Sequence, residues 1–185
     1  IPGAGAFGIH TPEGWVLYSG DLRMSGKQAK ETQRFTQEAA TLQPFLLIIE
    51  GTRANLITNR GSKHFTEQEV ADRISQIIKK AKGLVITDFG PRNLERLISV
   101  LKATEDVNRQ LVITTRDVYL LEDLSQCGEV DLPNPLGHHN IRIYAEKRVR
   151  TSEWESTLLE GCSAQCLTAE DAAYHPDEYV FCFSY

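Results

Sequence analysis

Short apolar runs alternate with amphipathic stretches from residue 66 onward, and this alternation constrains the fold more than any other feature. Apolar residues recur at helical spacing in three segments, which are predicted to be helices: 66–81, 93–104 and 118–124. Four apolar runs of strand length lie between and after them: 84–87, 111–114, 141–144 and 179–183. Strands that alternate with helices imply right-handed crossovers. They predict an α/β fold with a mainly parallel, helix-covered, Rossmann-like sheet.

The first third of the chain predicts fewer elements. Residues 4–10 and 15–20 have the pattern of two strands, and the Pro12 and Gly14 between them favour a hairpin turn. A polar stretch with helical character runs to about residue 42. The longest apolar run, Phe45-Leu46-Leu47-Ile48-Ile49, follows it and predicts a buried strand. Residues 51–64 show no period and predict a loop, whereas the charged region 146–178 supports no assignment.

Composition excludes several classes of protein. Of the 185 residues, 41% are hydrophobic and 24% are charged, which is typical of a globular chain rather than a disordered one. The formal net charge of −5 argues against a uniformly basic surface that coats nucleic acid, but not against a local basic groove. No apolar run approaches the roughly 20 residues of a membrane helix. Four cysteines do not make a disulfide scaffold in a chain of this length and favour a reduced, cytoplasmic setting.

The two ends of the chain are unusual. It starts with Ile1-Pro2-Gly3 rather than with Met, it has no signal-peptide pattern, and it ends in the strand-like run 179–185. We therefore expect the sequence to be a fragment of a longer protein.

Two carboxylates follow predicted strands in the first third of the chain. Asp21 comes directly after an apolar strand and Gly20, where the backbone can approach a ligand or a metal closely. Glu50 ends a continuous apolar strand, a position at which parallel sheets often carry functional side chains. The alternatives are an ordinary Gly-Asp turn and a solvated carboxylate. The residues alone leave both interpretations open.

The segment 88–96 lies between a predicted strand and a predicted helix. Arg92 and Asn93 stand near the start of that helix, and Arg96 lies one turn inside it. Free helix amides, the positive end of the helix dipole and two guanidinium groups would together form a phosphate site. The alternative is a loop with solvated arginines.

The other chemistry-bearing residues give weaker signals. The histidines include no pair at the spacing of a closed zinc site, and adjacent His138 and His139 are expected to point in different directions. Cys162 and Cys166 lack a second Cys or His pair, so buried or idle thiols are the default interpretation and a zinc knuckle is the alternative. One basic cluster is either a solvated face or a nucleic-acid-binding edge; it consists of Arg142, Lys147, Arg148 and Arg150.

Three blocks near the start of the chain resemble consecutive motifs of metallo-β-lactamase-fold nucleases. They are Ile1-Pro2-Gly3-Ala4-Gly5-Ala6-Phe7-Gly8-Ile9, Val16-Leu17-Tyr18-Ser19-Gly20-Asp21 and Leu47-Ile48-Ile49-Glu50-Gly51-Thr52. The helix that starts at Phe65-Thr66-Glu67 and the segment 89–96 resemble the entry into the β-CASP domain inserted in these nucleases. Ribonuclease J and the archaeal and eukaryotic pre-mRNA 3′-end endonucleases belong to this group. The resemblance covers residues 1 to about 115, and beyond that it is one of architecture.

This resemblance implies a domain division and a site. Residues 1–55 correspond to part of a metallo-β-lactamase αββα core, and residues 60–185 correspond to the β-CASP domain. In the family the Asp of the Gly-Asp block bridges two zinc ions, which implies metal binding by Asp21. The acidic residue of the later block orients histidine chemistry, which implies a catalytic role for Glu50. The implied activity is hydrolysis of a phosphodiester in single-stranded RNA by metal-activated water.

The chain also departs from the family pattern. It lacks the His-x-His-x-Asp-His motif, the histidine before the Ile-Pro block and the two C-terminal β-CASP histidines. We therefore expect these residues alone to hold no zinc and to be inactive, whereas the longer protein binds two zinc ions and RNA. The alternative is a non-catalytic α/β module that binds nucleic acid or a nucleotide with segments 88–96 and 142–150. Neither hypothesis involves a membrane, and both leave a homo-oligomer open.

Overall fold

The chain forms two compact units. The computed structural model describes residues 4–24, 26, 29–51, 65–90, 93–127, 132–148 and 150–184. The units are Ile1–Gln68 and Glu69–Tyr185, called unit 1 and unit 2 below. Among the described residues, no helix has the length and apolar character needed to cross a membrane.

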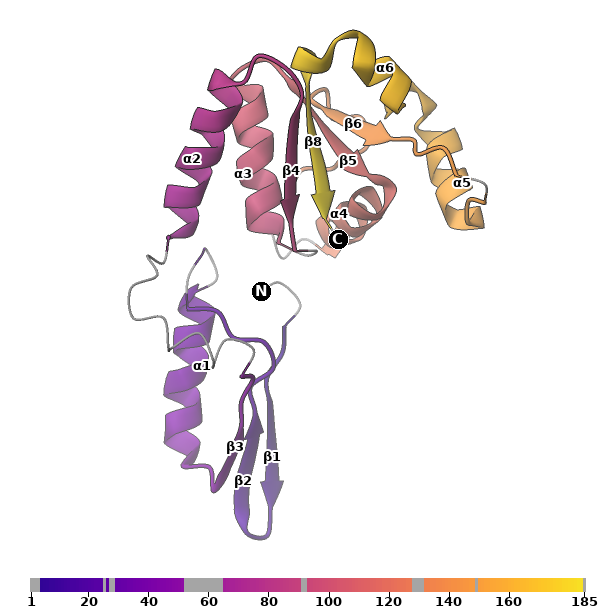
Figure 1. Ribbon diagram of the computed structural model, residues 1–185. Coiled ribbons are helices and arrows are strands. Elements are labelled where there is room, and N and C mark those ends of the chain that lie inside the picture. Colours follow the sequence, from indigo (N-terminus) through magenta and orange to yellow (C-terminus); the bar gives the residue numbers. More distant parts are fainter. Residues whose placement is uncertain are drawn as a thin grey trace. The chain divides into compact units, whose positions relative to one another are not determined.

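Unit 1 is a small sheet with a helix against it (Figure 1). Strands β1 (Phe7–Thr11) and β2 (Gly14–Tyr18) form the predicted antiparallel hairpin. Helix α1 (Ala29–Leu42) returns the chain, so that β3 (Leu46–Ile48) pairs parallel with β2. The register places Tyr18 opposite Ile48, and β2 and β3 therefore end at the same edge of the sheet.

The strand predicted over residues 45–49 exists, but the prediction that it is buried is wrong. Leu46, Leu47 and Ile48 are 44%, 48% and 47% exposed, and the flanking Phe45 and Ile49 are exposed as well. Strand β3 is at the edge of a three-stranded sheet, and its side chains are exposed on both faces of that sheet. In the described part of unit 1, α1 is the helix that lies against this sheet, and one helix cannot cover both of its faces (Figure 1).

Unit 2 is a five-stranded sheet flanked by helices, in which every strand pair is parallel. The strand order is β4-β8-β5-β6-β7. The strands are β4 (Val85–Phe89), β5 (Gln110–Thr114), β6 (Ile141–Tyr144), β7 (Cys166–Leu167) and β8 (Tyr179–Ser184). The helices are α2 (Glu67–Lys80), α3 (Leu94–Glu105), α4 (Thr115–Cys127), α5 (Glu153–Gly161) and α6 (Ala169–Tyr174). This architecture confirms the predicted α/β fold with a parallel, Rossmann-like sheet.

The last strand in the sequence lies inside this sheet. Strand β8 pairs with β4 on one side and with β5 on the other, so the C-terminal run joins strands formed much earlier in the chain. A large cluster on one face packs residues of α2, α3, α4 and α5 against the sheet, including the fully buried Val100, Ile113 and Val180. A smaller cluster around Val112 and Phe181 lies with α6 on the other face.

Two element assignments differ from the sequence prediction. Helix α4 begins at Thr115 rather than at residue 118, because the Thr114 side chain caps it directly after β5. The region 146–178 contains α5, β7 and α6. Helix α6 is only six residues long, and Thr168 and Asp171 bond reciprocally at its start. Elements this short carry too little periodicity to be recognised from the pattern of apolar residues.

Candidate functional site

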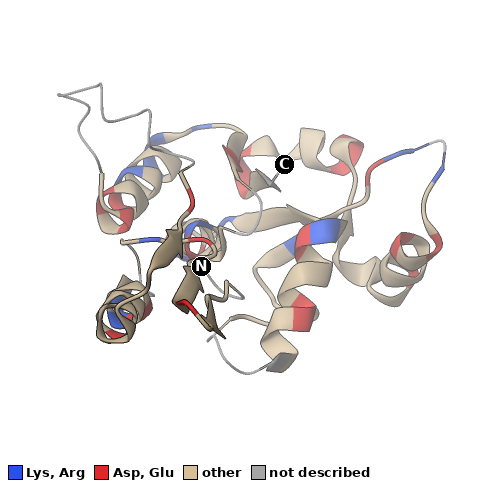
Figure 2. Cartoon of the chain, turned by 90° about the horizontal axis from the view of Figure 1, so that it is seen from below, with Lys and Arg blue, Asp and Glu red and all other residues tan. Residues whose placement is uncertain are grey.

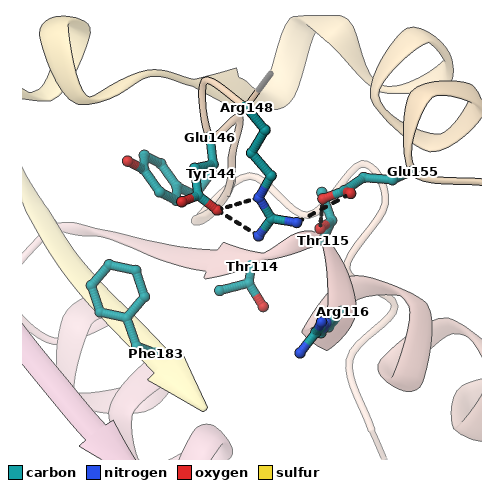
Figure 3. Close-up of a pocket in the computed structure, with 8 residues that line it drawn as sticks. All are labelled: Thr114, Thr115, Arg116, Tyr144, Glu146, Arg148, Glu155 and Phe183. Carbon is teal, nitrogen blue, oxygen red and sulfur yellow. Dashed lines mark hydrogen bonds and ion pairs between the residues drawn. The ribbon is translucent and has the colours of Figure 1, made fainter. Parts of the chain in front are cut away.

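A pocket lies at the carboxyl edge of the parallel sheet in unit 2. Its volume is about 110 Å³, and its lining comes from the ends of β5, β6 and β8, the loop after β6, and helices α4 and α5 (Figure 3). The lining residues are Thr114, Thr115, Arg116, Tyr144, Glu146, Arg148, Glu155 and Phe183. Ligands of open parallel α/β sheets bind outside the carboxyl ends of the strands. The position of the pocket therefore makes it the candidate binding site of unit 2.

The start of α4 is held rigidly beside this pocket. The Thr114 hydroxyl donates to Asp117 Oδ2 at 2.7 Å, and the Asp117 amide donates back to Thr114 Oγ1 at 3.3 Å. The Thr114 amide also donates to Asp117 Oδ2, at 3.2 Å. This reciprocal cap satisfies the third amide of the helix, but the amides of Thr115 and Arg116 precede the first intrahelical bond. The helix start thus offers positive backbone dipole to the carboxyl edge.

Arg148 links two carboxylates on the far wall of the pocket. Its Nε lies 2.6 Å from Glu146 Oε2, and its Nη1 lies 3.4 Å from Glu155 Oε2 (Figure 3). Glu155 is only 6% exposed, and its other oxygen accepts the Thr115 hydroxyl at 2.6 Å. A buried carboxylate needs such partners, because an unpaired buried charge is strongly unfavourable. The network ties the loop after β6 and helix α5 to the start of α4.

Arg116 and two aromatic rings complete the lining. The Arg116 side chain is exposed and makes no ion pair or hydrogen bond with any residue in the described ranges. The rings of Tyr144 and Phe183 meet edge to face, with centroids 6.1 Å apart. A volume of about 110 Å³ is below the roughly 300–1,000 Å³ of sites that enclose a whole small-molecule ligand. A guanidinium and the free amides of a helix start suit a single phosphate group whose sugar and base remain outside the pocket.

The predicted phosphate loop lies at the same edge of the sheet but is not part of this pocket. Asn93 Oδ1 accepts the Arg96 amide at 3.3 Å, so the side-chain oxygen of Asn93 caps helix α3. The Arg96 side chain is partly buried at the start of α3. Arg92 lies outside the described residues. The nucleic-acid-binding role assigned to these three residues thus stays a prediction.

Asp21 and Glu50 follow two neighbouring strands of unit 1. Strands β2 and β3 run parallel, and the Ser19 amide donates to the Ile48 carbonyl at 3.0 Å, which extends the pairing beyond Tyr18. Asp21 lies three residues after Tyr18, and Glu50 lies two residues after Ile48, which is the strand partner of Tyr18. Both carboxylates are exposed. The structure therefore brings the two predicted site residues to one edge of the sheet.

Gly20 fixes the backbone in front of Asp21. Its φ angle is +60°, and a Cβ atom at this position would lie 2.3 Å from the Gly5 carbonyl oxygen. Both the left-handed backbone and the close approach exclude a side chain, so the sequence requires glycine here. The N-terminal segment thus crosses the end of β2 immediately before the candidate ligand.

The described residues do not fit a complete zinc site. No group of three or more His, Cys, Asp or Glu side chains in the described ranges could hold a metal ion. Cys162, Cys166 and Cys182 are free thiols. Burial, with a smaller contribution from Cys166, raises the pKa of the Cys162 thiol to about 11, so this thiol is protonated near neutral pH.

The prediction that the two adjacent histidines point apart is wrong. The rings of His138 and His139 are stacked, with centroids 5.2 Å apart and planes inclined by 12°. Both residues lie in the turn before β6, where the backbone is not extended and successive side chains need not alternate. His138 Nδ1 accepts the Asn140 amide at 3.3 Å, which occupies one ring nitrogen in a local turn.

The described residues of the basic cluster 142–150 have different partners. Arg142, early in β6, donates to Gln110 Oε1 and the Ala164 carbonyl, whereas Lys147 pairs with Glu170 at 2.6 Å. Of the four residues in this cluster, Arg148 alone lines the pocket at the carboxyl edge of the sheet. Lys and Arg positions are interspersed with Asp and Glu positions on the elements of both units (Figure 2).

Sequence reasoning missed most of the pocket. The overlooked signal is Ile113-Thr114-Thr115-Arg116-Asp117, in which a capping Thr and Asp directly follow a buried strand. Glu155 could not be found in this way, because its role depends on a contact 40 residues away along the chain.

Comparisons with known proteins support the fold but not a function. No protein-family model matches the chain, and no curated protein matches it. The crystal structure of a protein of unknown function from Enterococcus faecalis V583 is similar over 100% of this chain, with a TM-score of 0.63 and 19% sequence identity. The present chain spans 39% of the length of that protein.

Proposed function

We propose that this chain is part of a zinc-dependent, RNA-processing nuclease of the metallo-β-lactamase, β-CASP type. In this proposal unit 1 contributes a strip of the catalytic floor, and unit 2 is the β-CASP domain that holds single-stranded RNA. In the same proposal the 185 residues alone are inactive, because they lack the histidine metal ligands of the family. The proposed setting is the cytoplasm, which accords with the free thiols of Cys162, Cys166 and Cys182.

The observation that carries the proposal is the common edge shared by Asp21 and Glu50. Two exposed carboxylates at the ends of adjacent parallel strands suit a site for hard or borderline cations and polar chemistry. Gly20 supports the same interpretation, because its close approach to Gly5 defines the backbone that presents Asp21.

Zinc enters this proposal only through the longer protein. Imidazole or thiolate ligands give a zinc site most of its selectivity, and Asp21 and Glu50 supply carboxylates alone. The described residues therefore do not fit the two-zinc site of the family, and we assign no hydrolytic step to them. Within the longer protein, Asp21 is the proposed metal ligand and Glu50 the proposed positioning carboxylate.

The test compares this chain with a polypeptide extended to the full length of its gene product. We expect the extended protein to bind zinc and cleave labelled single-stranded RNA, and the 185-residue chain to do neither. In the extended protein Asp21→Asn should abolish cleavage and lower the zinc content, and Glu50→Gln should slow cleavage by roughly 10- to 100-fold. Glu13→Gln, an exposed change in the hairpin turn, is the matched control. An extended protein without a His-x-His-x-Asp-His motif, or one that does not cleave RNA, would refute the proposal.

A second candidate function is favoured by the pocket of unit 2. In this alternative the chain is a non-catalytic α/β module that binds a nucleotide or nucleic acid through a phosphate at the carboxyl edge. Arg116 supports it, because an exposed guanidinium beside a helix start lacks a protein partner within the described ranges.

Salt titration of RNA binding tests this alternative. One phosphate contact contributes about 0.7 to the slope of log affinity against log salt concentration for a single strand. Arg116→Ala should therefore weaken binding and lower the slope by about that amount. Lys102→Ala removes the same charge from the exposed C-terminal turn of α3. This variant should leave the RNA affinity and the salt slope unchanged. Equal effects of the two variants would show that only overall charge matters.

A further inference from the structure

A second pocket lies between helices α4 and α5, on the surface of unit 2. It has a volume of about 580 Å³ and is lined by Tyr119, Glu122, Glu153, Trp154, Thr157 and Leu158. It shares no lining residue with the pocket at the carboxyl edge of the sheet. We call it the α4–α5 groove.

Two exposed aromatic rings form the centre of this groove. Tyr119 is 53% exposed and Trp154 is 42% exposed, although both belong to helices that pack on the sheet. Their ring centroids lie 5.5 Å apart, with an angle of 57° between the planes. Leu158, one turn after Trp154, packs against the buried core and forms the apolar floor. Clustered Trp and Tyr side chains are enriched in protein interfaces, where they contribute large contact area at low entropic cost.

Two carboxylates flank the rings. Glu122 lies on α4 and Glu153 on α5, and neither makes an ion pair with a residue in the described ranges. Among the residues that the structure describes, no Lys or Arg lines the groove. A cation over an aromatic face is attracted by the ring quadrupole, and neighbouring carboxylates add to that attraction. The groove thus has the chemistry of a site for a positively charged side chain.

We propose that the α4–α5 groove is a docking site for a partner protein, which places a Lys or Arg side chain against the exposed surfaces of the Trp154 and Tyr119 rings. The flanking carboxylates face the docked cation, and apolar neighbours of that residue lie on the floor at Leu158. The groove is an open depression of about 580 Å³, which leaves room for the residues on either side of the docked cation. This favours a peptide segment over a small free cation.

The experiment uses Trp154 as its own reporter. The chain contains two tryptophans, and Trp15→Phe leaves Trp154 as the single indole fluorophore. The probes are a short peptide that repeats Lys-Leu-Gly, a matched peptide that repeats Glu-Leu-Gly, and spermine as a free cation. We expect the Lys peptide to change Trp154 emission saturably, and the Glu peptide to have no effect. Spermine that binds as tightly as the Lys peptide would overturn the assignment to a protein segment.

Variants then test the groove itself by calorimetry with the Lys peptide. Trp154→Ala should weaken binding by about 30-fold, the effect typical of a central interface Trp. Glu122→Gln with Glu153→Gln should weaken it by about fivefold. Asp177→Asn with Glu178→Gln removes the same charge from the exposed turn at Pro176–Glu178 and should leave binding unchanged. Equal loss in both double variants, or no loss in Trp154→Ala, would overturn the proposal; circular dichroism verifies that each variant is folded.

Discussion

Thr115 and Glu155 are joined by a hydrogen bond of 2.6 Å that connects the first residue of α4 with the buried side of α5. The two residues lie 40 positions apart in the chain and are 5% and 6% exposed. Glu155 also faces Arg148, so one buried carboxylate joins three segments at the carboxyl edge of the sheet. The shape of the pocket at the carboxyl edge of the sheet therefore depends on a hydrogen bond between two segments that are distant in the sequence.

Thr115→Val tests how much this bond stabilises unit 2. The variant keeps the shape of the side chain but removes one donor from a buried carboxylate. We expect the free energy of unfolding to fall by about 1–3 kcal/mol, the usual effect of an unsatisfied buried polar group. The control is Thr157→Val on the exposed side of α5, which should change stability by less than about 0.5 kcal/mol. Equal midpoints of urea unfolding for the two variants would contradict the role of Thr115.

Gly20→Ala tests the constrained backbone before Asp21. The left-handed φ angle alone costs an L-residue roughly 1–2 kcal/mol, and the contact with the Gly5 carbonyl adds to it. Gly83→Ala is the control, because a Cβ atom there meets no atom within 4 Å. We expect thermal denaturation to show a lower unfolding temperature for Gly20→Ala and an unchanged one for Gly83→Ala. Under the proposed nuclease function, Gly20→Ala should also slow RNA cleavage by the longer protein, because it displaces Asp21.

More of the fold than of the site could be predicted from the sequence, because helices and strands are local patterns and the site depends on contacts between distant segments. The helices at 66–81 and 93–104 and the strands at 84–87 and 111–114 are local patterns, and the structure contains them as α2, α3, β4 and β5. The burial of Leu46 to Ile48 was mispredicted, because burial depends on which elements cover a strand. The Glu155 network was invisible for the same reason, since its partners Thr115 and Arg148 come from other segments.

Alkaline pH should destabilise unit 2 through its buried thiols. Burial, with a smaller contribution from the Asp117 carboxylate, raises the pKa of the Cys182 thiol to about 12, whereas the ordinary value is 9.0. The folded state therefore holds a proton that the unfolded state releases first. The corresponding stability is complete below pH 9.0 and is lost as the pH rises towards about 12.

Urea unfolding at a series of pH values measures this effect. The free energy of unfolding of the wild type should fall between about pH 9 and 11. That of Cys182→Val should fall less, because this variant has no thiol at that position. Cys162→Val removes the second buried thiol and should also reduce the decline, since the pKa of Cys162 is raised to about 11. A Cys182→Val profile parallel to that of the wild type would mean that this thiol is not buried in solution.

The position of β8 inside the sheet leads to a final prediction about stability. Val180 lies opposite Val85 of β4 and opposite Leu111 of β5, and it is 0% exposed. Ile86 lies one residue along on β4 and is 62% exposed, although its side chain is larger. We expect Val180→Ala to lower the free energy of unfolding by about 2 kcal/mol, from lost burial and the cavity that remains. Ile86→Ala should cost less than about 1 kcal/mol, because most of the removed surface is already in water. Calorimetry of the two variants under the same conditions measures their unfolding temperatures. A larger decrease for Ile86→Ala than for Val180→Ala would contradict the central position of β8.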